Sequence, residues 1–562
     1  MRRNVLTPGL AGLVSVLVVL SGCAAGGTAS DSDNAASSVI DASLRDLAPY
    51  LSQVIGWGEC DSEWLVDANY QSAVMADSTV DCSTVLVPAT YLGSEDIPDF
   101  SIAMMRLRKK GTEPDAAIFI NPGGPGGSGI DQVQSADFPG PLRDEYAFIG
   151  FDPRGVGYSD FADGSEIKCS DELDFTSYFQ EGSLANEEEL ADAIERSDLY
   201  YQDCVERNPY WWTLSTDHVV QDLDILRELV TPGAGLNFIG SSYGTTIAGR
   251  YVSDFPDTVG KIVFDSPTTV ASDRIESAVT DLEARERKLR GWVEGYATHA
   301  GISFDQAWAS MLDLRQRADD DLLIGYAGYE RSSVYPQYMA SSESLLINGI
   351  FALNYWPEAR AQEYFNNAID TALSDNWIGG LEWLAFSMDG YDPDSLDGTS
   401  LANKAIDRSN EYEVRVIVNS MDYDLPELTE DEQRELSDRL KEVGPLWSEL
   451  TTDPSGFEYF GPSMGLDWAS IADDDDSIPD PPTTPFIPAN PSGKQLLIVG
   501  SIYESVTPYS FAQDTAKLLG SPLISIESEN HAPAAWYNNE CLNDILVQYF
   551  LTDEVIADTT CG

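Results

Sequence analysis

The chain has 562 residues, of which 94 are Asp or Glu and 32 are Lys or Arg, so its net charge is −62. This charge argues against a partner made of nucleic acid or of anionic lipid headgroups, because the bulk of the surface would repel both. The length and the hydrophobic content of 43% are ample for a large core and favour more than one domain.

Residues 1–23 predict an export signal. Arg2 and Arg3 precede an apolar run that ends in Leu-Ser-Gly-Cys23. This ending is similar to the lipobox of bacterial lipoproteins, in which the cysteine is lipidated, with palmitate among the acyl groups, and becomes the mature N-terminus. Residues 24–45 are a flexible linker. We therefore expect an exported protein that is held at the outer face of the membrane by a lipid anchor only, or is partly released from it.

Of the 7 cysteines, six remain after Cys23, and an even number in an exported protein suits disulfides. Pairing each cysteine with its neighbour in the sequence closes three short loops without crossing. No pair has the CxxC spacing of a zinc site, so we expect neither a metal nor another cofactor. The predicted disulfides are Cys60–Cys82, Cys169–Cys204 and Cys541–Cys561.

Short β-rich runs alternate with longer helical patterns, which predicts an α/β fold with a mainly parallel sheet. Residues 46–267 and 492–562 carry this alternation and form the predicted core. Residues 268–491 contain long helical stretches and end in a linker rich in Pro and Asp, which together indicate an inserted helical cap. The expected strands lie at 84–92, 100–108, 116–120, 146–151, 236–239, 261–264, 495–499 and 523–527.

The stretch FIGSSYGTT, residues 238–246, places two serines between two glycines. Its pattern Gly-x-Ser242-x-Gly fits a nucleophile elbow, in which a serine lies on a tight turn between a strand and a helix. A predicted strand precedes Ser242 and a helical pattern follows from Thr245, so the motif has the required context. We take Ser242 as the nucleophile and Ser241 as a neighbour without a role in catalysis.

A serine nucleophile needs a general base, and the base needs a carboxylate to orient it. Of the 3 histidines, His531 follows the last predicted strand, where the chain order nucleophile, acid, histidine places the base. Glu504 ends the preceding strand, in LLIVGSIYESVTP, and is our candidate acid. Asp265, which follows the strand at 261–264, is the alternative acid.

The oxyanion formed by attack on a carbonyl needs preorganised hydrogen-bond donors. We expect one donor to be the backbone N–H of Tyr243, the residue after the nucleophile. The second should come from the loop NPGGPGGSG, residues 121–129, where we choose Gly124. A phosphate-binding loop is the competing interpretation, but this loop lacks the lysine and the GxGxxG spacing of such a loop.

Six motifs resemble those of the secreted bacterial tripeptidyl aminopeptidases, in the proline iminopeptidase-like family of α/β-hydrolases: VPATYL, INPGGPGGSG, FIGFDPRGVGYSD, GSSYGTT, VGSIYESVTPY and ENHAP. The resemblance spans nearly all of the mature chain and is weakest in the cap. It implies an α/β-hydrolase fold, with Ser242 as nucleophile and His531 as base. The chain departs from the family at Glu504, where a motif like GxLDPVTP usually has aspartate, and at Asn530, where glycine is common.

The resemblance implies a serine exopeptidase that forms an acyl-enzyme. Such an enzyme removes short peptides, with tripeptides as the favoured product, or single residues from free N-termini. We expect a monomer in which a carboxylate of the cap binds the substrate ammonium. The candidates, chosen from their nearness to an apolar run, are Glu411, Glu413, Asp422 and Asp424. Two other functions stay open: an esterase that uses the same triad, and a surface lipoprotein that binds a partner without catalysis.

Overall fold

The computed structural model describes eleven stretches of the chain and two single residues. The predicted export signal, Cys23 and nearly all of the predicted linker lie outside these stretches. The described residues are 45–66, 73–91, 97–169, 203–270, 274–320, 342–356, 358–374, 411–422, 430–451, 486–536 and 539–562, with Gly380 and Leu384.

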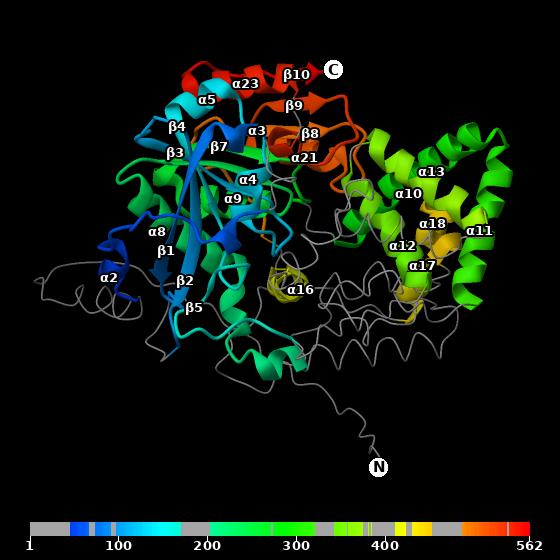
Figure 1. The fold of residues 1–562 in the computed structure, drawn as a ribbon, viewed down its shortest axis with the longest axis horizontal. Helices are drawn as coiled ribbons and strands as arrows, with labels where there is room; N and C mark the ends of the chain where they lie inside the picture. The colour runs from blue at the N-terminus through cyan, green and yellow to red at the C-terminus, as the bar shows by residue number, and fades with distance from the viewer. Residues whose placement is uncertain are drawn as a thin grey trace, which may run out of the picture.

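A ten-stranded sheet forms the middle of the body of the molecule, beside a separate group of helices (Figure 1). The strand order is β1-β2-β4-β3-β6-β7-β8-β9-β10, and the short β5 pairs with β2. All neighbours from β4 to β10 are parallel, whereas β2 is antiparallel to β1, β4 and β5. The strands are β1 Ser78–Val87, β2 Phe100–Lys109, β3 Ala116–Asn121, β4 Tyr146–Phe151, β5 Asp160–Phe161, β6 Leu236–Ser241, β7 Val259–Asp265, β8 Leu497–Ser501, β9 Leu523–Ile526 and β10 Thr559–Cys561.

The mainly parallel α/β sheet is confirmed, but the prediction of eight strands is wrong, since the described residues contain ten. The two missed strands, β5 and β10, are two and three residues long, too short for a periodic pattern. The first strand begins at Ser78 rather than at residue 84. It pairs along the whole of β2, from Ser78 opposite Lys109 to Val87 opposite Phe100, and this pairing rather than its own polar sequence fixes its extent.

Helices cover both faces of the sheet, as its continuous apolar strands require. One face packs against α8 (Thr216–Val230), α9 (Gly244–Asp254) and α21 (Tyr509–Leu519). The other packs against α4 (Gly129–Ser135), α5 (Gly140–Glu145) and α23 (Glu540–Leu551). Successive residues of β3 serve the two faces, because Ile118 and Ile120 enter one core and Phe119 the other.

Helices of the segment predicted as a cap form a second hydrophobic core beside the sheet (Figure 1). Their long stretches are amphipathic, and aromatic residues such as Trp292 and Phe365 fill the space between them. These helices are α10 Arg274–Ala300, α11 Phe304–Asp320, α12 Ser342–Ala352, α13 Glu358–Leu373, α17 Glu430–Val443 and α18 Pro445–Thr451.

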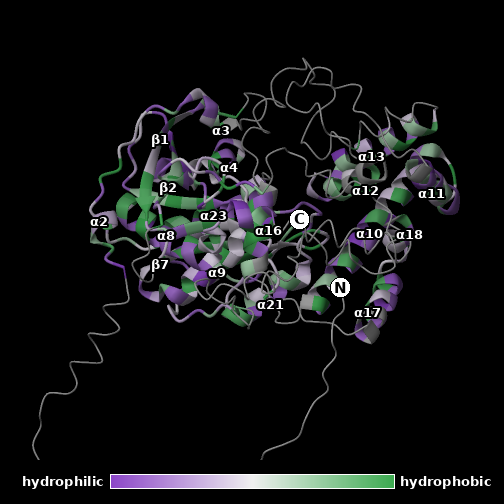
Figure 2. Cartoon of the chain, turned by 90° about the horizontal axis from the view of Figure 1, so that it is seen from below, coloured by the Kyte–Doolittle hydropathy of each residue, from purple (hydrophilic) through white to green (hydrophobic). Residues whose placement is uncertain are grey.

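Helix α16 (Glu411–Asp422) differs from the other helices of the predicted cap. Its apolar face carries Val414, Ile417, Val418 and Met421, and these side chains pack into the core of the sheet rather than into the cap core. Figures 1 and 2 both place α16 beside the body of the molecule and away from the cap helices. The segment predicted as a cap therefore also contributes a helix to the body.

The three predicted disulfides are confirmed: Cys60–Cys82, Cys169–Cys204 and Cys541–Cys561 are bonded. The first ties the N-terminal segment to β1, and the third ties α23 to β10. Within the described stretches, no helix combines the length and the apolar character needed to cross a membrane.

Candidate active site

Ser242 lies on the turn between β6 and α9, as the sequence predicts. Its φ of 53° is in the left-handed region, which is rare for a residue other than glycine and typical of a strained nucleophile elbow. Its N–H donates to the carbonyl of Asp265 at 2.9 Å, and its carbonyl accepts from the N–H of Thr245 at 2.9 Å. The turn thus holds a half-buried serine at the carboxyl end of the sheet.

Ser241 has a different environment from Ser242. It is the last residue of β6, it is fully buried, and its Oγ donates to Asp265 Oδ2 at 3.0 Å. This hydroxyl is therefore engaged inside the fold, which fits the prediction that Ser241 is the neighbour and Ser242 the nucleophile.

The glycine-rich loop after β3 passes directly against the elbow. A Cβ on Gly123 would lie 2.6 Å from the Ser241 carbonyl oxygen and 2.7 Å from the Tyr243 nitrogen, and its φ is 98°. No side chain fits there, so this position requires glycine. The contact places the loop beside the backbone N–H of Tyr243, where an oxyanion would be bound.

Gly124, the predicted second donor, follows in the same loop. Its N–H has no hydrogen-bond partner among the described residues. The loop around it is fixed, because the Gly127 N–H donates to the Gly123 carbonyl at 3.0 Å and the Gly123 N–H donates to Asn121 Oδ1 at 3.0 Å. A free donor on a rigid loop is what an oxyanion hole needs, and the role of Gly124 remains a prediction.

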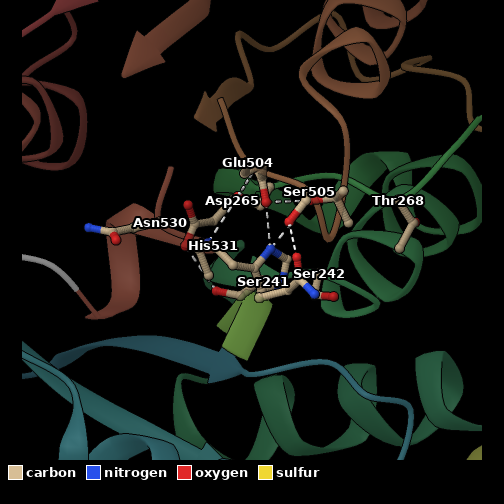
Figure 3. A network of polar contacts seen from close by, with 12 residues as sticks. Ser241, Ser242, Asp265, Thr268, Glu504, Ser505, Asn530 and His531 are labelled. Atoms are coloured by element: carbon tan, nitrogen blue, oxygen red, sulfur yellow. Dashed lines mark hydrogen bonds and ion pairs between the residues drawn. The ribbon is translucent and has the colours of Figure 1, made fainter. Parts of the chain in front are cut away.

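Glu504 and His531 meet at the carboxyl ends of β8 and β9 (Figure 3). His531 Nδ1 lies 2.7 Å from Glu504 Oε2, and the two side chains are 10% and 1% exposed. An Nδ1–H donated to this carboxylate leaves Nε2 unprotonated, the tautomer that can accept a proton from a serine. Figure 3 shows Ser242 at the same site as this pair.

Ser266 also belongs to this network, and sequence reasoning missed it. Its Oγ donates to Glu504 Oε1 at 2.7 Å and accepts from the Ala532 N–H at 3.0 Å. Thr507 Oγ1 donates to Glu504 Oε2 at 3.0 Å, so both carboxylate oxygens are held. In the sequence, Ser266 stands out only as the residue after Asp265 at the end of β7. This position does not predict a contact with Glu504.

Asp265, the alternative acid, faces a different set of partners. Its two oxygens accept from Ser241 Oγ and from the N–H groups of Ala534 and Ala535, at 3.0 to 3.2 Å. Burial raises the pKa of Asp265 to about 7, although these hydrogen bonds oppose the shift. The carboxylate hydrogen-bonded to the His531 ring is thus that of Glu504, and Asp265 anchors the chain that follows the histidine.

The cap reaches the site through a short 3₁₀ helix, η4 (Leu353–Tyr355). The Tyr355 ring lies edge-on to the imidazole of His531, with 5.9 Å between centroids, and remains 46% exposed. Asn354 Oδ1 accepts from Ser505 Oγ at 2.5 Å, next to Glu504. The cap therefore forms a wall of the site on the side of the acid and the histidine.

Of the four carboxylates proposed to bind a substrate ammonium, Glu411, Glu413 and Asp422 belong to α16. Glu413 is half-buried, and burial raises its pKa. Asp422 ends the helix and accepts a hydrogen bond from Thr216 Oγ1 at 2.5 Å. The Glu411 side chain and Asp424 lie outside the described part of the chain.

Comparison with known proteins identifies two matching family models. Residues 116–394, which include Ser242, match the model described as alpha/beta hydrolase fold. Residues 465–561, which include Glu504 and His531, match the model described as TAP-like protein. The candidate nucleophile and its two partners thus lie in two separately matched segments.

Some of the curated relatives are named as peptidases and others as esterases. The chain is 24% identical over 575 residues to the serine protease Hip1 of Mycobacterium tuberculosis, covering 96% of this chain and 94% of that protein. It is 30% identical over 295 residues to a tripeptidyl aminopeptidase of Streptomyces coelicolor, covering 49% and 50%. It is 25% identical over 521 residues to the carboxylesterase B of Mycobacterium tuberculosis, covering 90% and 89%.

Proposed function

From the premise that this chain belongs to the tripeptidyl aminopeptidase-like α/β-hydrolases and is a serine hydrolase, we propose that it is an exopeptidase. Its substrates are extracellular peptides with free N-termini. From these it releases short peptides, with tripeptides as the favoured product, or single residues. The observation that carries the proposal is the hydrogen bond of 2.7 Å between His531 Nδ1 and Glu504 Oε2, beside an elbow that bears Ser242.

In the proposed mechanism, Ser242 Oγ attacks the scissile carbonyl while His531 Nε2 takes the hydroxyl proton. Glu504 stabilises the imidazolium that forms, and the N–H groups of Tyr243 and Gly124 bind the oxyanion. The imidazolium then gives its proton to the leaving amine, which leaves an acyl group on Ser242. A water molecule, deprotonated by His531, releases the acyl group and restores the enzyme.

The restriction to free N-termini rests on the cost of burying an ammonium group. A cation taken from water into a covered site is unstable unless a carboxylate meets it. Helix α16 carries Glu413 and Asp422, two of the carboxylates that we propose for this role, and the strong negative charge of the chain attracts a cationic substrate end.

A matched pair of substrates tests this proposal. A tripeptide p-nitroanilide with a free amine should be cleaved much faster than its N-acetylated form. If the two are cleaved at equal rates, the exopeptidase proposal is wrong. Because an acetyl group also adds bulk, a second control is the same tripeptide p-nitroanilide with a methyl group on its N-terminal nitrogen. This substrate keeps the positive charge and should still be cleaved.

An esterase is the second candidate function, favoured by the relative named carboxylesterase B, which aligns over 90% of this chain. The same triad cleaves esters and amides, so the fold does not choose between them. The test compares kcat/KM for a tripeptide p-nitroanilide with kcat/KM for p-nitrophenyl butyrate. A peptidase should give a much higher ratio of the first value to the second than a simple esterase does.

The proposed exopeptidase is a monomer anchored outside the cell by a lipid on Cys23, with a body formed by residues 46–267 and 492–562 and an insertion at 268–491. The three disulfides support export, because such bonds persist in oxidising compartments. Metabolic labelling with palmitate should mark the protein, and Cys23→Ala should abolish the label. An unchanged label in this variant would contradict the anchor.

A further inference from the structure

Helix α16 ends at a carboxylate that connects it to the elbow. We propose that Asp422 is a positioning residue for the oxyanion donor, acting through the hydroxyl groups of Thr216 and Tyr243. This inference rests on the proposed site, in which the Tyr243 N–H binds the oxyanion, but not on the proposed peptide specificity.

The three residues form a continuous chain of hydrogen bonds. Asp422 Oδ2 accepts from Thr216 Oγ1 at 2.5 Å, and the same Thr216 oxygen is hydrogen-bonded to the hydroxyl of Tyr243. Thr216 and Tyr243 are only 3% and 4% exposed. Water therefore does not compete for these hydroxyl groups, and each must find its partner within the protein.

The direction of the chain follows from the chemistry of its members. Above its pKa of about 7, Asp422 is ionised and can only accept, so Thr216 donates its one proton to the carboxylate. The Thr216 oxygen then has only lone pairs left, and the phenol of Tyr243 must donate to it. Asp422 thus decides the orientation of a hydroxyl on the residue next to the nucleophile.

The connection matters because the Tyr243 side chain and backbone N–H share one Cα. The residue has φ −54° and ψ −26°, and it stands at the start of α9 immediately after the strained Ser242. Fixing the phenol end of the ring limits rotation of the residue and so the direction of its N–H. Oxyanion donors contribute most when they are aimed before the reaction begins.

Asp422 lies among charged groups that act on it in opposite directions. Burial and the neighbouring Asp217 raise its pKa, to about 7, whereas Thr216 and the guanidinium of Arg250 lower it. Arg250 is itself paired with Asp217 at 2.5 Å. A capping role at the start of α8 is the simpler interpretation of Asp422, and it does not require the Tyr243 hydroxyl.

Three isosteric variants separate positioning from capping: Asp422→Asn, Thr216→Val and Tyr243→Phe. Turnover is measured on p-nitrophenyl acetate, which needs only serine hydrolase activity. We expect each variant to lower kcat about tenfold at unchanged KM, since a donor that is misaimed acts on the transition state and not on the bound ester. Because the three groups act in one chain, the double variant Thr216→Val/Tyr243→Phe should lose no more than either single variant.

Inhibition by a boronic acid separates a positioning role of Asp422 from a purely structural one, because a helix cap that does not aim the Tyr243 N–H would leave the inhibition constant unchanged. Its tetrahedral adduct puts an oxygen in the oxyanion hole, so the inhibition constant should rise by the same factor as kcat falls. Asp544→Asn, an exposed carboxylate on α23, is the matched control and should change neither quantity. Thermal unfolding shows whether each variant is folded. If Asp422→Asn and Thr216→Val do not fold, Tyr243→Phe still tests the proposal, because it removes only the hydroxyl group and keeps the ring.

A normal kcat in a folded Tyr243→Phe protein overturns the positioning role and leaves Asp422 as a helix cap. A lowered kcat with an unchanged boronate constant overturns it as well. If Ser242→Ala retains ester turnover, the proposed site itself is wrong. If Ser242→Ala is inactive and the three variants are normal, only this inference fails.

Discussion

Ser266 Oγ donates a hydrogen bond to Glu504 Oε1 at 2.7 Å. The same hydroxyl accepts from the Ala532 N–H, so a single side chain joins the candidate acid to the residue after the candidate base. With Thr507 and His531 on the other oxygen, the Glu504 carboxylate has three hydrogen-bond partners within the described residues. A glutamate has one more rotatable bond than an aspartate, and these partners restrict that freedom.

The identity of the acid is tested by charge removal. Glu504→Gln keeps the shape but removes the charge that stabilises the imidazolium, and should lower turnover by about 10⁴-fold, as for a neutralised triad aspartate. Glu504→Asp keeps the charge but misplaces it by about an ångström, which can cost about 10²-fold. Turnover of a p-nitrophenyl ester measures both.

Asp265→Asn is the matched control for Glu504→Gln. It should leave turnover within about tenfold of wild type while lowering the free energy of unfolding by about 1–3 kcal/mol, because buried N–H donors lose an acceptor. Severe loss of turnover in Asp265→Asn, together with a nearly normal Glu504→Gln, would reverse the assignment.

The two serines of the elbow should differ in reactivity. Ser242→Ala should abolish labelling by a fluorophosphonate, because the label bonds covalently to the nucleophile. Ser241→Ala should keep the label and lose about 1 kcal/mol of stability with its hydrogen bond to Asp265. The label is read by mass spectrometry, and a labelled peptide in Ser242→Ala would assign the nucleophile to another residue.

The glycine-rich loop should not tolerate a methyl group at Gly123. Gly123→Ala places a Cβ within 2.7 Å of the Tyr243 nitrogen, so the loop must move away from the oxyanion site. Loss of a donor costs about 10²–10³-fold in kcat, and we expect a loss of that order. Gly140→Ala, whose added Cβ meets nothing within 4 Å, should be close to wild type.

Acid stability should depend on His218. Burial and the neighbouring Arg154 lower the pKa of His218 to about 3, whereas an unfolded histidine titrates near pH 6.5. The unfolded state therefore binds the extra proton, and stability is lost as the pH falls below about 6.5. At pH 5 this one group should account for about 2 kcal/mol.

The His218 prediction is measured by urea unfolding from pH 7.5 to 4.5. His218→Gln cannot take up a proton, so its free energy of unfolding should fall less over this range than that of the wild type. Equal pH dependence in both proteins would mean that His218 is not kept neutral by the fold.

The sequence by itself determined the features that depend on local patterns. Runs such as Ala116–Asn121 are apolar on both faces, which is typical of buried parallel strands, and the glycines around Ser242 indicate a tight turn wherever the chain goes next. The cysteine pairs are likewise close in the sequence, so their loops close locally.

Only the tertiary structure decided which carboxylate meets His531. Asp265 ends β7 and Glu504 follows β8 in the parallel part of the sheet, so both lie at the same edge. Which one reaches the imidazole depends on side-chain directions that are set by long-range contacts, such as the one from Ser266 to Glu504. Helix α16 is similar, because an amphipathic helix must cover an apolar surface, but its own sequence does not say whether that surface is the cap or the body.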